Sequence, residues 1–170
     1  ADGKVVQAAP TFYAEPGSNW DIQGRFQQQG YGPFVGTGNR PWEASLGTFD
    51  ANHPIMRGVE AAYENLRQTV VLTREASLIA SWLEQEENDQ NMQIPFVATS
   101  GNVVAINSFV SDIGYWQEDM DIIVHNSVVW LHTRNQTPWF SVQPVTGTVG
   151  LSSTLNVIMT FDTKKSLIDR

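Results

Sequence analysis

Residues 94–107 read IPFVATSGNVVAIN and contain two apolar runs, 94–99 and 103–107, on either side of Ser100-Gly101-Asn102. Runs of this length around a Ser-Gly-Asn turn are typical of a β-hairpin. The second run, VVAIN, is almost entirely apolar, as expected of a strand that is covered on both faces. The stretch therefore predicts a hairpin whose second strand is buried within a sheet.

Other segments also have the patterns of regular structure. Short β-branched and apolar runs predict strands at 3–9, 68–72 and 77–82, the last two joined by a polar turn. Residues 117–132 carry apolar side chains at helical spacing, with acidic residues in the first turn and His132 near the end. We expect a helix here whose apolar face lies on the sheet.

Two segments have the composition of loops. Proline and glycine recur throughout residues 10–52, so we expect an irregular, aromatic-bearing region with at most one helical turn, at 20–29. Residues 84–93 are almost all Glu, Asn, Asp and Gln, which predicts a solvated loop tip.

The residue pattern of the sequence changes after Arg134. Proline and glycine punctuate short β-prone runs at 139–142 and 155–161. We therefore expect a domain over residues 1–133, and a β segment or tail over residues 134–170.

The composition of the chain limits the classes of partner that it can bind. The chain has 170 residues and a mass of 18.9 kDa, with 10 Lys and Arg against 18 Asp and Glu, for a net charge of -8. Nucleic acid and anionic membranes are disfavoured, because neutralising phosphates needs a basic patch. No run is apolar enough to suggest membrane insertion. Only 16% of residues are charged, below the average of about 25%. A surface with so few charged side chains favours an extracellular or cell-surface protein.

Three stretches in order resemble a known family. They are NWDIQGRFQQQGYGPF at 19–34, LGTFDANHPIMRGV at 46–59, and the series from PFVATSGNVVAINSFVSD to IVHNSVVWL at 95–131. Together they resemble the later half of the glutamine-amidotransferase-like (ThuA-like) α/β module found in large bacterial secreted proteins. The resemblance implies an α/β fold, an incomplete flavodoxin-like three-layer sandwich with a C-terminal β tail. The family's first strands would precede residue 3 and are missing here. The numbered chain begins with Ala rather than Met and is therefore expected to be a processed or excised piece.

A second resemblance lies in the tail. Trp139, Phe140, Ser141, Val142, Pro144 and Gly147 match the opening pattern of BACON-type immunoglobulin-like modules. This resemblance implies the start of a β-sandwich, of which about a third is present.

Catalysis of the family's kind is not expected. Glutamine amidotransferases attack with a cysteine on a strand-to-helix elbow, and this chain has neither a cysteine nor a G-x-S-x-G elbow that could replace it. A hydrolase half-site completed by another chain stays open. We expect no metal and no cofactor, because His125 and His132 are not at the i, i+4 spacing of helical zinc ligands. The helix N-terminus accounts for Asp119 and its acidic neighbours.

Several residues are candidates for ligand binding. His53 opens the HPIMRG box and could reach a pocket or could only fix the Pro54 turn. Asp112 could face the edge of the sheet where open α/β folds bind ligands. Four aromatic residues in loop segments could form a sugar-stacking platform or could simply pack against the protein: Trp20, Tyr31, Trp42 and Trp116.

Two further tryptophans, Trp82 and Trp130, lie in apolar periodic segments and are expected in the core. Asn135 begins an N-x-T glycosylation pattern.

Two functions from different classes follow. The leading hypothesis is a noncatalytic structural or interaction module whose unpaired sheet edges assemble it into an oligomer or filament. Its partners would be other copies of the chain or the rest of its parent protein. The alternative is a carbohydrate-binding or carbohydrate-active domain that uses the loop aromatics.

Overall fold

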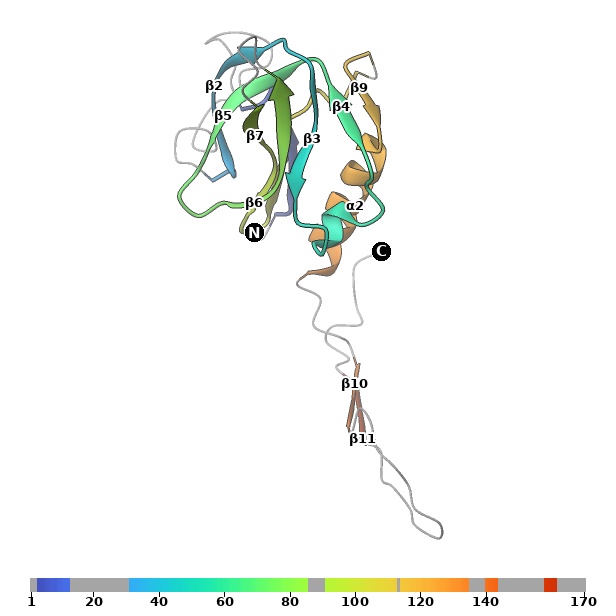
Figure 1. Cartoon of the computed structure of the whole chain (residues 1–170). Helices are drawn as coiled ribbons and strands as arrows, with labels where there is room; N and C mark the ends of the chain where they lie inside the picture. Colours follow the sequence, from blue (N-terminus) through green and yellow to red (C-terminus); the bar gives the residue numbers. More distant parts are fainter. Residues whose placement is uncertain are drawn as a thin grey trace. The chain divides into compact units, whose positions relative to one another are not determined.

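The computed structural model describes residues 3–12, 31–85, 91–112, 114–134, 140–143 and 158–161. The chain divides into two compact units, Ala1–Thr133 and Arg134–Arg170. Figure 1 draws both units and labels most of their helices and strands. The helical turn predicted at 20–29 lies outside the described residues.

The larger unit is built around a curled seven-stranded sheet that forms a half-barrel (Figure 1). Neighbouring strands pair antiparallel, except for the first two in spatial order, which are parallel. The spatial order is β1 (Val5–Ala8), β8 (Val103–Ile106), β7 (Asn91–Ser100), β6 (Ser77–Gln85), β3 (Ala44–Phe49), β4 (Ala62–Glu64) and β9 (Trp116–Glu118).

The predicted α/β fold class, an incomplete flavodoxin-like three-layer sandwich, is wrong, because the unit is mostly β. A flavodoxin-like sheet is parallel and has helices on both faces. Here the described residues contain one α-helix and one parallel strand pair. The fold that the amidotransferase-like resemblance implies is thereby overturned.

The apolar run in β8 is compatible with both the implied fold and the observed one. Val104 and Ile106 belong to a buried cluster that includes residues of the helix, whereas Ala105 belongs to a second cluster with Phe34 and Val70. The strand is therefore covered on both faces, as predicted, but by a helix on one side and a second small sheet on the other. A hydrophobic run alone cannot distinguish this arrangement from a strand between two helical layers.

The second sheet consists of β2 (Phe34–Arg40) and β5 (Arg67–Leu72), which pair antiparallel. Asn107, just after β8, joins this sheet to the larger one. Its Oδ1 accepts from the backbone N–H of Gln68 at 2.9 Å, and its Nδ2 donates to the backbone oxygens of Gln68 at 2.8 Å and Pro95 at 3.1 Å. A side-chain amide thus bonds to β5 as a neighbouring strand would.

The irregular region predicted over 10–52 contains two strands, β2 and β3, so that prediction is wrong for residues 34–49. The glycines do not break these strands. The pairing of β2 shifts between Gly36 and Gly38, and a shift of this kind is where a strand tolerates glycine. Pro41 lies in the connection between β2 and β3 and needs no ladder hydrogen bond.

The loop predicted at 84–93 is also partly wrong. β6 continues to Gln85 and β7 begins at Asn91, while residues 86–90 lie outside the described residues. The Glu84 side chain is buried between two arginines. The polar composition of residues 84–93 therefore did not indicate that Glu84 forms a buried ion pair near the end of a strand.

The predicted strands near 68–72 and 77–82 are confirmed as β5 and β6, and the predicted hairpin as β7 and β8. Gly101 in the hairpin turn has a φ of +50°, which glycine adopts without strain. Trp82 is fully buried and stacks on Phe96 with ring centroids 3.7 Å apart, which confirms its place in the core.

The predicted helix is confirmed as α2 (Met120–Thr133), although it begins three residues later than expected, because residues 116–118 form β9. Its face with Met120, Ile123 and Leu131 is buried in the main core. Asn126 holds the short 3-10 helix η1 (Pro54–Met56) against it, donating to the backbone oxygens of Ile55 and Arg57.

In the smaller unit, β10 (Phe140–Gln143) and β11 (Ile158–Phe161) form an antiparallel pair in which Phe140 is opposite Phe161. Strands were expected at 139–142 and 155–161; β10 overlaps the first run at 140–142 and β11 the second at 158–161, while residues 139 and 155–157 lie outside the described residues.

Candidate functional site

A cavity of about 430 Å³ lies beside the connection between β2 and β3. Its lining combines aromatic, carboxylate and hydroxyl groups from β3, β4, β6 and the connection: Trp42, Glu43, Ala44, Ser45, Tyr63 and Leu83. Trp42 keeps 54% of its surface exposed. This cavity, called the Trp42 pocket below, therefore offers a broad aromatic surface next to several oxygen atoms.

Two polar residues of the Trp42 pocket interact with each other. The pKa of Tyr63 is raised, first by desolvation and then by the hydrogen bond that its hydroxyl donates to Glu43 and by the charge of that carboxylate. Tyr63 is the middle residue of β4, between the buried residues Ala62 and Glu64. The alternation of a strand thus places its side chain on the opposite face from the core.

A buried ion cluster lies behind the same connection. Glu84 accepts from Arg40 Nε at 2.6 Å and pairs with Arg67 Nη2 at 2.7 Å. Arg67 in turn donates from Nη1 to the backbone oxygen of Trp42. Burial lowers the pKa of Arg67, and the carboxylate of Glu84 opposes that shift. The cluster therefore anchors the backbone that carries Trp42.

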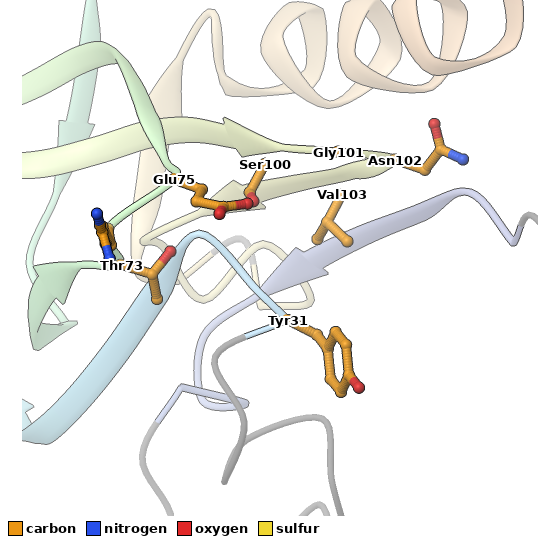
Figure 2. A pocket seen from close by; sticks show the side chains of 8 residues that line it. Tyr31, Thr73, Glu75, Ser100, Gly101, Asn102 and Val103 are labelled. Atoms are coloured by element: carbon orange, nitrogen blue, oxygen red, sulfur yellow. The ribbon is translucent and has the colours of Figure 1, made fainter.

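A second cavity, of about 620 Å³, lies between the β5–β6 turn and the β7–β8 turn. Figure 2 shows the side chains that line it, among them Tyr31, Glu75, Ser100 and Val103. Thr73 joins the β5–β6 turn to the segment that follows Tyr31. Its backbone N–H donates to Pro33 O at 2.9 Å and its hydroxyl donates to Gly32 O at 3.1 Å. Tyr31 is 56% exposed, so this Tyr31 cavity provides an aromatic site comparable in exposure to Trp42.

The structure separates the aromatic residues that were predicted to form one platform. Tyr31 and Trp42 line different cavities. Trp116 lies on β9, packs against the main core and donates from Nε1 to the backbone oxygen of Val110 at 3.2 Å. Trp20 and the glycosylation candidate Asn135 lie outside the described residues.

The two polar candidates have local structural partners. His53 caps η1, because its Nδ1 accepts from the backbone N–H of Ile55 at 3.2 Å, and its ring lies 5.2 Å from that of Trp130. Asp112 accepts from the backbone N–H of Gly114 at 2.9 Å in an exposed turn. Neither His53 nor Asp112 lines the two cavities described above.

A second buried carboxyl belongs to Glu64, the last residue of β4. Glu64 accepts from the hydroxyl of Ser108 and from the backbone N–H of Leu66 at 3.1 Å. Desolvation raises its pKa from 4.5 to about 7, although these hydrogen bonds act in the opposite direction. Glu64 is 0% exposed, so a substrate cannot reach it without a rearrangement of the sheet.

Sequence reasoning selected Trp42 but missed Glu43, Tyr63 and the arginine pair. A Trp-Glu pair directly after a proline was the available signal for Glu43. Tyr63 had no such signal, because its position depends on the pairing of β3 with β4, two short strands that are separated by a loop and the 3-10 helix η1.

Neither a scan against protein-family models nor comparisons with curated proteins and solved structures found a match for this chain. The resemblance to the amidotransferase-like family therefore gains no support from them. Within the part of the chain that the structure describes, no three His, Asp or Glu side chains are grouped closely enough to hold a metal ion. No helix among the described residues has the length and apolarity needed to cross a bilayer.

Proposed function

We propose that this chain is a noncatalytic binding module of an extracellular protein, and that it holds an uncharged saccharide against Trp42. The observation that carries the proposal is the half-exposed indole at a pocket that also holds Glu43, Ser45 and Tyr63. A pyranose ring has an apolar C–H face that fits an indole, and hydroxyl groups that need hydrogen-bonding partners.

Charge favours an uncharged ligand. The Glu43 carboxylate is in the pocket, and the chain as a whole has a net charge of -8. Uronic or sulfated sugars would be repelled by both, because like charges disfavour association. Carboxylate and hydroxyl oxygens can instead accept hydrogen bonds from neutral sugar hydroxyls.

Calorimetric titration with a panel of neutral and acidic oligosaccharides tests this proposal. We expect neutral members to bind, and Trp42→Ala to weaken binding at least about tenfold, the usual cost of removing a central aromatic anchor. Tyr31→Ala, at the other cavity, is the matched control and should bind as the unmodified chain does. Absence of binding by every neutral sugar would contradict the proposal, and sugar cleavage in the same mixtures would contradict its noncatalytic part.

Assembly through strand pairing is a second candidate function, favoured by the smaller unit. Among the described residues of that unit, β10 and β11 pair with each other over four residues each, and a pair of strands without further neighbours is marginal in water. Strand edges of this kind recruit further strands. In the larger unit the outer strands β1 and β9 have four and three residues, so we assign the pairing to β10 and β11. The proposed partners are other copies of the chain or the rest of its parent protein.

Light scattering across a dilution series tests this second function. The mass of the full chain should rise with concentration above 18.9 kDa, whereas a fragment ending at Thr133 should keep one mass throughout. A full chain that stays monomeric at all concentrations would rule out self-assembly.

A further inference from the structure

Glu84 occupies an unusual position for a carboxylate near the end of a strand. Its side chain is 3% exposed, and each of its oxygens faces a different guanidinium group. Oε2 lies 2.6 Å from Arg40 Nε, and Oε1 lies 2.7 Å from Arg67 Nη2. A buried carboxylate shared by two arginines is held in one place, because leaving either charge unpaired in the interior is costly.

Both arginines act on the same short stretch of backbone. Arg40 is the last residue of β2, and Arg67 donates to the backbone oxygen of Trp42. Pro41, between them in sequence, restricts its own φ. One carboxylate thus restrains the residue before Pro41 directly and the residue after it through Arg67.

We infer that Glu84 is a positioning residue for the Trp42 pocket, and that it raises saccharide affinity by holding the Trp42 backbone in place before the ligand arrives. This inference rests on the proposed function. Order that exists in the free protein need not be created on binding, so a preorganised aromatic anchor binds more tightly than a mobile one.

Direct contact with the ligand does not explain such a role. Glu84 is not among the residues that line the Trp42 pocket, although its neighbour Leu83 is. Its oxygens are already engaged by Arg40 and Arg67. We therefore expect an effect of Glu84 on sugar binding to pass through these arginines and the 40–42 backbone.

The test uses the full chain labelled with fluorotryptophan, in which the fluorine NMR signal of Trp42 is assigned by its loss in Trp42→Phe. Arg40→Ala removes one of the two links and leaves the fully buried Arg67–Glu84 pair intact, so it should fold. Glu84→Gln removes the charge that serves both links. Glu75→Gln, at the Tyr31 cavity, is the matched control.

We expect both Arg40→Ala and Glu84→Gln to shift or broaden the Trp42 signal, and to weaken binding of the best neutral sugar about two- to tenfold. Glu75→Gln should change neither. If Glu84→Gln fails to fold, Arg40→Ala still decides. An unchanged Trp42 signal, or unchanged affinity despite a changed signal, would overturn the inference. Absence of sugar binding by the unmodified chain would instead refute the proposed function. The Trp42 signal would still report whether Glu84 and its two arginines hold the Trp42 backbone in place.

Discussion

Asn107 shows how a single polar residue joins two sheets. Its side chain makes three hydrogen bonds, two to the backbone of Gln68 and one to that of Pro95. Its backbone oxygen accepts from Trp82 Nε1 at 2.8 Å. Asn107, Gln68 and Trp82 are fully buried, so removing the amide would leave the buried backbone N–H and C=O of Gln68 unpaired.

We therefore expect Asn107→Ala to lower the free energy of unfolding by roughly 2–4 kcal/mol, the cost of several unsatisfied buried groups together with a small cavity. Urea denaturation measures this. The matched control is Asn52→Ala at an exposed turn, where a change of less than about 0.5 kcal/mol is usual. Similar losses for the two variants would show that Asn107 does not join the sheets.

Glu64 predicts a dependence of stability on pH. Its pKa is about 7 in the folded chain against 4.5 ordinarily, so the folded state binds the proton more tightly than the unfolded state does. Its contribution to stability is complete below about pH 4.5 and is lost as the pH rises through about 7. The total is on the order of 3 kcal/mol.

Glu64→Gln keeps a hydrogen-bonding partner for Ser108 but cannot ionise. Between about pH 5 and about pH 8, its free energy of unfolding should fall less than that of the unmodified chain. Denaturation series at both pH values provide the comparison. Parallel losses in the two proteins would show that Glu64 does not titrate in this range.

At the residue scale, the sequence predicted apolar positions better than polar ones. Trp82 could be placed in the core because it lies within an apolar run. Glu84 could not, because only the approach of Arg40 and Arg67 from other strands makes a buried carboxylate tolerable there. Of the Trp42 pocket, the aromatic residue was predictable from its loop context, and its carboxylate and tyrosine partners were not.

Among the elements, β3 depends on a close approach to its neighbour. A Cβ on Gly47 would lie 3.0 Å from both Leu83 N and Ser81 O of β6, and 2.6 Å from Gln93 Oε1. That Gln93 oxygen also accepts from the Thr48 hydroxyl at 3.2 Å. Glycine is therefore required where β3 passes β6.

Gly47→Ala should destabilise the chain by about 1–3 kcal/mol, because the backbone of β6 must shift to admit the methyl group. Gly38→Ala is the control, since a Cβ there would meet no atom within 4 Å. It should be neutral or slightly stabilising. Thermal melting of both variants separates the two cases, and equal melting temperatures would contradict the close approach.

Elements with local signals were predictable, and those that depend on distant partners were not. The β7–β8 hairpin has its turn and both strands within one short stretch, and α2 has a helical apolar period. In contrast, β3 and β4 are short strands that gain their order from pairing with each other, and β3 also pairs with β6. No pattern within residues 10–52 indicates that these residues pair with strands further along the chain.

For the whole molecule, the fold class depended on which layers cover the central strands. The sequence indicated that β8 is buried on both faces, but not that α2 covers one face and the β2–β5 sheet the other. The packing of the β2–β5 sheet against the larger sheet also brings Arg40 and Arg67, from β2 and β5, to Glu84 of β6. The Trp42 pocket is thus a product of the tertiary fold, and only its aromatic residue could be anticipated.

A crystal structure of the chain soaked with the tightest-binding neutral oligosaccharide of the panel tests saccharide binding most directly. We expect a pyranose ring stacked on the indole of Trp42, with a sugar hydroxyl within hydrogen-bonding distance of Glu43. A sugar bound only in the Tyr31 cavity, or a crystal in which the Trp42 pocket stays empty at saturating ligand, would contradict it.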